Sequence, residues 1–154
     1  MKKFQGFTII EMLIVVTIIA VLSGLILRGM GGALPKTRDS RRLGDLKNIQ
    51  NMLELYYTKT GSYPSAFEGG SFLTEFELEV ALQAQLGSNV KVPRDPSGGP
   101  NHYYYCPGAA SATGSITSYI LGAVMETGVP SDSITGQTCA SKTCGSGNFY
   151  CVGM

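Results

Sequence analysis

The first pattern along the chain is a long apolar run from Phe7 to Leu27, in which Glu11 is the only charged residue. A helix of roughly 20 apolar residues matches the thickness of a bilayer core. Each Leu, Ile, Val or Phe favours insertion by about 0.3–0.6 kcal/mol, whereas one carboxylate costs about 2.5–3.5 kcal/mol, so insertion is favoured overall. The pattern predicts a membrane-spanning helix over residues 7–28. Lys2 and Lys3 precede the run, which predicts a cytoplasmic N-terminal end and export of the rest of the chain.

A break in the pattern follows, because the stretch Gly29–Pro35 contains three glycines and a proline. Each glycine weakens a helix by roughly 1 kcal/mol, and proline removes a backbone hydrogen bond. We therefore predict a flexible or melted helix segment over residues 29–39, with a simple linker as the alternative. Helical periodicity resumes after Asp39 or Ser40, either of which is a suitable N-cap.

The resumed helix is amphipathic. Its apolar residues recur at three- and four-residue steps, and they are Leu43, Leu46, Ile49, Leu53 and Tyr56 or Tyr57. Its polar residues are Arg41, Arg42, Asp45, Lys47, Asn48 and Glu54. We expect the apolar face to pack on a sheet. We interpret Arg38, Arg41 and Arg42 as a solvated helix face, in preference to a patch that binds phosphate or lipid headgroups.

The C-terminal part of the chain has shorter patterns. Thr74 and Glu77 have the spacing of a capping box, which predicts a short helix that ends at Gly87. Further runs rich in β-formers predict three or four antiparallel strands, at Val90–Val92, Tyr103–Cys106, Tyr119–Glu126 and Phe149–Val152. The predicted fold class is α+β: a long N-terminal helix, membrane-spanning in its first half and amphipathic in its second, packed on a small antiparallel sheet. The globular domain covers residues 40–154, and its three consecutive tyrosines from Tyr103 are expected to be packing residues.

The N-terminal run has two ordinary interpretations. A secretory signal peptide has an apolar region of about 7–15 residues before a small-x-small cleavage site. This run is longer, although Gly31-Gly32-Ala33 offers such a site, which would leave Leu34 as the new N-terminus. The other interpretation is an uncleaved anchor that retains Met1.

A third interpretation follows from the string Gly6-Phe7-Thr8-Ile9-Ile10-Glu11, which resembles the prepilin peptidase motif of type IV pilins and type II secretion pseudopilins. The resemblance implies a leader over residues 1–6, cleavage between Gly6 and Phe7, and N-methylation of Phe7. The stretch Leu53–Pro64 also resembles the end of the helix in these proteins. The resemblance further implies a pilin-like fold, processing by prepilin peptidase, an inner-membrane assembly platform and a helical filament of the same or related subunits.

Glu11 has a physical rationale of its own, because a carboxylate in an apolar membrane helix is costly without a partner. Cleavage after Gly6 would create a cationic amine on Phe7. Parallel helices staggered by about one turn, roughly 5–6 Å, would place Glu11 of one copy beside that amine of a neighbour. The pair would favour assembly in register. The alternative is a carboxylate that snorkels to the cytoplasmic interface.

Four cysteines lie in the C-terminal third: Cys106, Cys139, Cys144 and Cys151. An exported location favours disulfides, and four cysteines allow three connectivities between which the sequence does not decide. Zinc is disfavoured, because no C-x-x-C pair occurs and His102 is the sole histidine. We therefore predict disulfides and no metal site.

The loop Pro93–Pro100, with Tyr103, resembles a D-P-x-G-x-P-Y pattern of major pseudopilins, which hold calcium with an adjacent loop. Calcium takes about six or more oxygen ligands. Here Asp95 and Asp132 are the acidic residues nearby, without the spacing of a dedicated site. We therefore predict no cofactor and keep calcium as an alternative.

Composition limits the remaining classes of function. Twelve Lys and Arg nearly balance eleven Asp and Glu, so nucleic acid is not indicated. A single histidine, with no G-x-S-x-G motif and no phosphate loop, argues against an enzyme. The sequence predicts a filament subunit, anchored in the cytoplasmic membrane before assembly and at the cell surface afterwards, for adhesion, motility, DNA uptake or protein secretion. The alternative is a monomeric membrane-anchored binding protein outside the cytoplasm.

Overall fold

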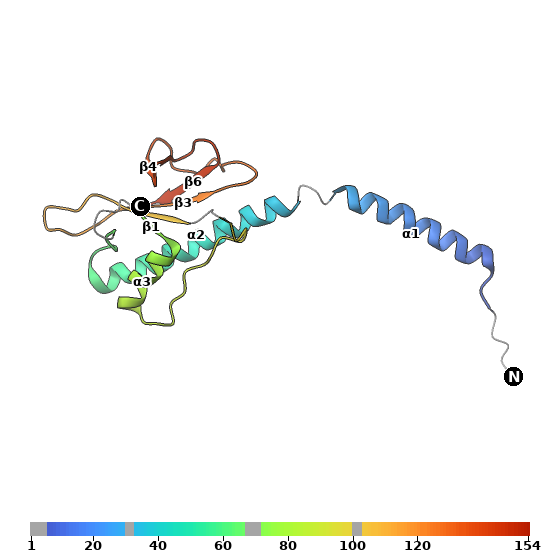
Figure 1. The fold of residues 1–154 in the computed structure, drawn as a ribbon, viewed down its shortest axis with the longest axis horizontal. Coiled ribbons are helices and arrows are strands. Elements are labelled where there is room, and N and C mark those ends of the chain that lie inside the picture. Colours follow the sequence, from blue (N-terminus) through green and yellow to red (C-terminus); the bar gives the residue numbers. More distant parts are fainter. Residues whose placement is uncertain (1–5, 30–32, 67–71, 100–102) are drawn as a thin grey trace. The chain divides into compact units, whose positions relative to one another are not determined.

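The computed structural model describes residues 6–29, 33–66, 72–99 and 103–154. The chain divides into two units, an N-terminal unit from Met1 to Leu34 and a globular unit from Pro35 to Met154 (Figure 1). Each is described separately below. Most of the leader, with Lys2 and Lys3, and Gly31 and Gly32 of the small-x-small site lie outside the described residues.

Helix α1 (Ile9–Gly29) makes up most of the described part of the N-terminal unit. Thr8 Oγ1 accepts a hydrogen bond from the backbone N–H of Glu11 at 3.3 Å, so Thr8 acts as the N-cap. The stretch Ile9–Ile26 has a mean hydropathy of 2.7 and is long and apolar enough to cross a membrane. All of its side chains are exposed in the single chain, so the helix requires a lipid or protein environment. The predicted hydrophobic helix is confirmed.

Helix α2 (Ala33–Thr60) starts earlier than predicted. Pro35 is tolerated because it lies in the first turn, where backbone N–H groups have no helical partner. The prediction of an N-cap at Asp39 or Ser40 is therefore wrong, since both residues are inside the helix. Residues 33–39, predicted as part of the flexible or melted segment, are helical here. The helix ends at Gly61, whose φ of 73° is the left-handed conformation that glycine adopts readily.

Helix α3 (Glu75–Leu86) begins at the predicted capping box. The Glu77 carboxylate accepts hydrogen bonds from the Thr74 backbone N–H at 2.8 Å and from the Thr74 hydroxyl at 2.9 Å. Gly87 closes the helix with a φ of 108°. The following residues Val90–Val92 are not a strand, so that prediction is wrong. Glu79 of α3 accepts a hydrogen bond from Val92 N–H at 2.9 Å, and this side-chain contact replaces a strand partner.

The main sheet has four antiparallel strands in the order β1-β2-β3-β6. Their bounds are β1 Leu73–Thr74, β2 Tyr104–Pro107, β3 Tyr119–Val124 and β6 Phe149–Gly153. The strands β4 (Thr138–Cys139) and β5 (Lys142–Thr143) form a separate small hairpin. Gly122 in the middle of β3 leaves room for the ring of Phe149 on the neighbouring strand, because a Cβ there would lie 2.2 Å from that ring. Three of the four predicted strands are thus confirmed.

The core lies between α2 and the sheet. Leu46, Ile49 and Leu53 of α2 are buried against strand residues that include Leu121. Tyrosines also pack in this core. Among them, Tyr103 donates a hydrogen bond from its hydroxyl to Asp45 at 2.8 Å. The predicted α+β arrangement, with the amphipathic helix packed on a small antiparallel sheet, is confirmed.

Candidate functional site

The residues predicted for processing and assembly lie at the start of the N-terminal unit. Gly6, Phe7 and Thr8 are irregular in structure and precede α1, and Phe7 is 75% exposed. A peptide bond in an exposed, irregular segment is accessible to a protease. The structure thus places the Gly6–Phe7 bond where cleavage is feasible, while cleavage itself stays a prediction.

Glu11 lies in the first turn of α1, where the partial positive charge of the helix N-terminus favours a carboxylate. Its backbone N–H is already satisfied by Thr8, and its side chain is exposed. The arrangement leaves the carboxylate able to accept an ammonium group from outside the chain. The capping role of Thr8 was not predicted, although the spacing T-x-x-E from Thr8 to Glu11 indicates it.

A second cluster of charged residues, in the globular unit, was missed. Arg42 is fully buried, so its interpretation as part of a solvated helix face is wrong. Its guanidinium donates to Asp95 at 2.7 and 3.0 Å, to Asp39 at 2.8 Å, and contacts Glu126 at 2.8 Å. We call Arg42, Asp39, Asp95 and Glu126 the buried charge cluster; the first three are buried, and Glu126 lies at its exposed rim. It joins α2 to the loop at Asp95 and to the segment that follows β3.

The three carboxylates of the buried charge cluster are also bound by groups other than Arg42. Asp39 accepts from the backbone N–H groups of Glu126 at 2.9 Å and Thr127 at 2.8 Å, and from the Thr127 hydroxyl at 2.6 Å. Asp95 accepts from the backbone N–H of Ser97 at 2.9 Å and from its hydroxyl. Glu126 accepts from Arg38 Nε at 2.9 Å. For Asp39 and Asp95, these contacts satisfy charges that would otherwise be costly to bury.

The pKa values of these carboxylates are all lowered. For Asp95, burial alone raises the pKa, but hydrogen bonds from Arg42 and Ser97 outweigh it. For Asp39, burial likewise raises the pKa, and hydrogen bonds from Thr127, the backbone of Glu126 and Arg42 outweigh it. The hydrogen bond from Arg38 is the main cause of the lowered pKa of Glu126. All three therefore stay ionised at neutral pH.

A periodicity in the sequence could have revealed the cluster. Asp39 and Arg42 continue the spacing of the buried residues Leu46, Ile49 and Leu53 towards the N-terminus of α2. Charged residues at core positions of a helix indicate partners elsewhere in the chain, because an unpaired buried charge is rare.

The two aspartates considered for the calcium alternative both have partners within the chain. The Asp95 carboxylate is occupied by a buried guanidinium, and the Asp132 carboxylate accepts a hydrogen bond from the Tyr150 hydroxyl at 3.3 Å. Within the described ranges, no group of three or more His, Cys, Asp or Glu side chains could hold a metal ion. A cation placed beside Asp95 would also meet the positive charge of Arg42.

The four cysteines form two disulfides, Cys106–Cys139 and Cys144–Cys151, which gives the connectivity that the sequence left open. The first disulfide joins β2 to the β4–β5 hairpin. The second joins the residue after β5 to β6. The two disulfides therefore fasten the hairpin to the main sheet at both of its ends.

The two disulfides are expected to differ in their contribution to stability. They span sequence separations of 33 and 7 residues. In the chain-entropy model, these loops correspond to about 3.7 and about 2.4 kcal/mol. We expect Cys106→Ala with Cys139→Ala to lower the free energy of unfolding more than Cys144→Ala with Cys151→Ala, measured by urea denaturation. The reverse order would show that loop closure is not the source of the stabilisation.

Comparisons with known proteins agree with the structure. Residues 1–27 match the prokaryotic N-terminal methylation motif, and residues 32–133 match the family of type II secretion system protein G. The type II secretion system core protein G of Vibrio cholerae is 27% identical over 125 residues, covering 80% of this chain and 83% of the relative. The protein of the same name from Aeromonas hydrophila is 25% identical over 134 residues, covering 85% and 91%.

A third relative, core protein G of Escherichia coli, is 29% identical over 99 residues, covering 62% of this chain and 68% of the relative. No solved structure matches the chain. The family match covers most of the globular unit, and the motif match covers Gly6, Phe7 and Glu11. The chain therefore belongs to the family of type II secretion system protein G, the pseudopilins.

Proposed function

We propose that the chain is the repeating subunit of a type II secretion pseudopilus and serves protein secretion rather than adhesion, motility or DNA uptake. The observation that supports this choice is the family match over residues 32–133, which lies in the globular unit. The N-terminal motif is shared with pilins, so the globular unit is the part that distinguishes a secretion pseudopilin from a pilin.

The proposed life cycle begins in the cytoplasmic membrane, with α1 spanning the bilayer and its N-terminal end in the cytoplasm. Prepilin peptidase cuts the exposed Gly6–Phe7 bond, and Phe7 becomes N-methylated. The inner-membrane assembly platform then adds the subunit to a filament. In that filament, Glu11 of one copy pairs with the terminal amine of the next. Two charges that are costly in lipid then compensate each other.

Within this proposal, the subunit holds the loops of its globular unit in place without a bound metal ion. The support is the buried charge cluster, in which Arg42 supplies the positive charge, together with the two disulfides.

Mass spectrometry of the mature protein tests the proposal. We expect an N-terminus at methylated Phe7 in cells that contain prepilin peptidase, and an unprocessed chain that retains Met1 in cells that lack it. A start at Leu34 would instead indicate conventional secretion. Retention of Met1 in both strains would indicate an anchored binding protein.

The choice between secretion and pilus function requires a second measurement. In the source organism, deletion of the gene is expected to abolish the export of secreted enzymes and to leave surface motility and DNA uptake unchanged. Expression of the wild-type chain should restore export. Loss of motility with normal export would contradict the proposed role.

A further inference from the structure

Two surface features of the globular unit lie outside the buried charge cluster. One is an apolar stripe on α3, formed by Phe76, Val80 and Ala84, and the other is a groove between α2 and β6. We propose that in the filament the apolar stripe of one copy docks into the α2–β6 groove of the next copy. This inference rests on the proposed function and specifies the contact between globular units.

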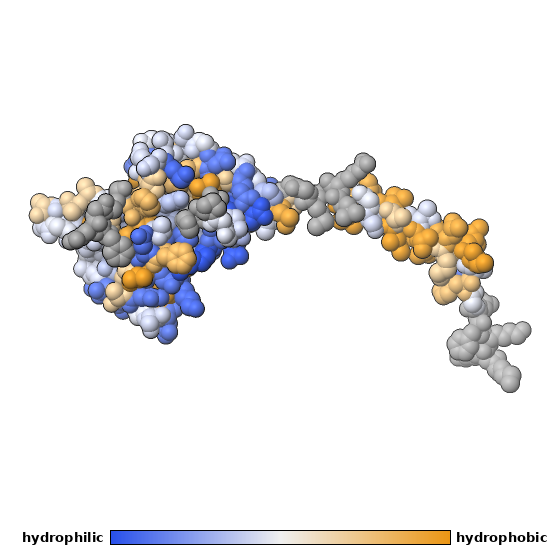
Figure 2. Space-filling model, in the orientation of Figure 1, coloured by the Kyte–Doolittle hydropathy of each residue, from blue (hydrophilic) through white to orange (hydrophobic). Residues whose placement is uncertain are grey.

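The apolar stripe is unusual for the surface of this domain. Its three residues are spaced four apart, so they lie on one face of the helix. Phe76 is 57% exposed and Val80 is 60% exposed. Figure 2 shows hydrophobic side chains gathered over α3 among hydrophilic ones. Among the described residues of the globular unit, the only other exposed large hydrophobic residues are Leu55 and Met154.

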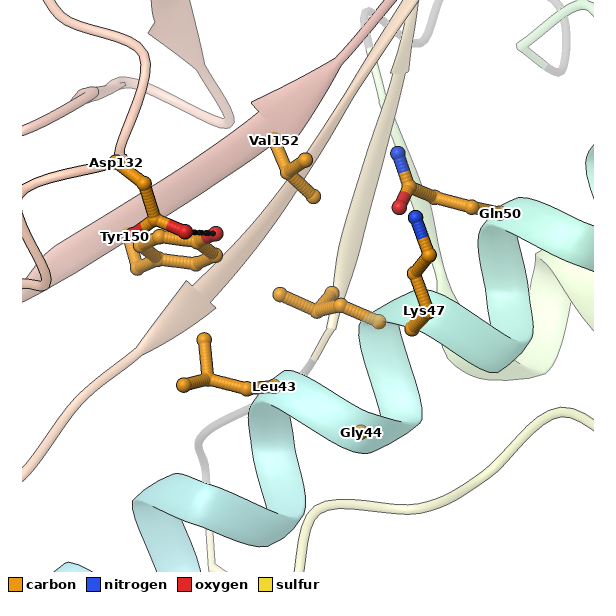
Figure 3. Close-up of a pocket in the computed structure, with 8 residues that line it drawn as sticks. Leu43, Gly44, Lys47, Gln50, Asp132, Tyr150 and Val152 are labelled. Carbon is orange, nitrogen blue, oxygen red and sulfur yellow. Dashed lines mark hydrogen bonds between the residues drawn. The ribbon is translucent and has the colours of Figure 1, made fainter.

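The groove has a volume of about 420 Å³. Its floor and walls include Leu43 and Gly44 of α2 and Val152 of β6 (Figure 3). Gly44 is exposed where it lines the groove, and a Cβ at this position would have no atom within 4 Å. A helix interior disfavours glycine by roughly 1 kcal/mol relative to alanine. The fold of the single chain therefore does not require a glycine at position 44.

The charges beside the two features are complementary. The Arg94 guanidinium lies 3.7 Å from the centre of the Phe76 ring, and it pairs with Glu79 at 3.1 Å. The groove carries Asp132 and Lys47, which lie on opposite sides of it in Figure 3. Arg94 of one copy can therefore face Asp132 of the next copy, and Glu79 can face Lys47.

The positions of the two features favour an open chain of subunits. Helix α3 contacts β1 and β2, whereas the groove lies at β6, and these are opposite edges of the sheet. A contact between two different surfaces is heterologous, and its repetition builds a helical filament when the rotation does not close a ring. A stripe of three side chains is much smaller than the roughly 1,200 Å² of a stable interface. The contact therefore requires the high local concentration that membrane-anchored α1 helices provide.

A photocrosslinking experiment tests the contact directly. Val80 of the full chain is replaced by benzoylphenylalanine, and filaments assembled in cells are irradiated. We expect crosslinks from this position to residues 43–50 or 150–152 of a different copy, identified by mass spectrometry. Crosslinks that map only to other surfaces, or filaments without crosslinks, would overturn the proposal while leaving the proposed function intact. Wild-type protein that forms no filaments would count against both.

A matched pair of variants tests the same contact without a crosslinker. Gly44→Leu adds a bulky side chain at the lining of the groove, and the open space at Gly44 and the better helix propensity of leucine mean that Tm should stay the same or rise. We expect filament yield to fall by about tenfold or more, because the stripe can no longer enter. Asn48→Leu introduces the same side chain at an exposed position of α2 that does not line the groove, and it should assemble normally. An equal loss with both variants, or normal assembly of Gly44→Leu, would refute the contact.

Discussion

Replacement of Arg42 by methionine is expected to lower the free energy of unfolding of the globular unit by about 3–5 kcal/mol. Methionine fills a similar volume but carries no charge, so Asp39 and Asp95 would stay buried without their cation. For a domain of this size the loss corresponds to a decrease in Tm of roughly 10–25 °C. Thermal unfolding of the detergent-solubilised full chain measures it.

Arg41→Met is the matched control for this prediction. Arg41 precedes Arg42 on α2, but its side chain is 63% exposed and its nearest partner, Asp45, is 3.7 Å away. Exposed ion pairs contribute about 0–1 kcal/mol, so this variant should unfold almost like the wild type. Equal losses for Arg41→Met and Arg42→Met would show that the buried charge cluster is not the reason for the effect.

The dependence on pH gives an independent signature of the buried charge cluster. The folded-state pKa values of Asp39, Asp95 and Glu126 are lower than usual. Their contribution to stability is therefore fully present above the ordinary carboxyl pKa of about 4, and it is lost as the pH falls through the lower folded values. In Arg42→Met the carboxylates lose one source of this lowering, so the acid-unfolding midpoint should move to higher pH.

Replacement of Glu11 by leucine is expected to leave membrane insertion and processing intact and to reduce filament formation by roughly a hundredfold or more. Removal of one partner of a buried ion pair costs about 3–5 kcal/mol, because the amine of Phe7 would remain uncompensated in lipid. Insertion should improve slightly, since the carboxylate is the only charge in the apolar stretch Ile9–Ile26. Quantification of sheared filaments against total processed subunit measures the effect.

Thr17→Leu is the control for Glu11→Leu, because it places the same side chain on the same helix without removing a charge. It should assemble at wild-type levels. If Glu11→Leu also forms filaments in normal yield, the carboxylate only snorkels to the membrane interface, and the proposed pair with the amine of Phe7 is wrong.

The parts of the fold that depend on local patterns were predictable. The apolar run over α1, the capping box of α3 and three strands follow from residues that lie close together in the sequence. The start of α2 was not predicted correctly, because Pro35 was expected to interrupt a helix that in fact begins two residues before it. Val90–Val92 was predicted as a strand on its apolar residues, whereas a glutamate from α3 takes the hydrogen bond that a strand would have made.

The errors at the buried charge cluster and the open question of the disulfides have a common physical origin. Asp95 lies 53 residues from Arg42 along the chain, and Cys139 lies 33 residues from Cys106. Such pairs form only after the sheet and helices are assembled, so local periodicity can indicate that Arg42 is buried but cannot identify Asp95 as its partner. The motif around Gly6, Phe7 and Glu11 was predictable for the opposite reason, since all of its residues lie within one short segment.

Strand β6 (Phe149–Gly153) pairs with β3 (Tyr119–Val124) through five consecutive positions, although a long stretch of chain separates the two strands. The main sheet and the disulfide at Cys151 are therefore incomplete until residues 149–153 are available to the rest of the domain. Folding cannot proceed vectorially from the anchored end, and the nascent domain waits with the edge of β3 unpaired. A chain truncated before residue 149 would keep that edge exposed and would be prone to aggregation.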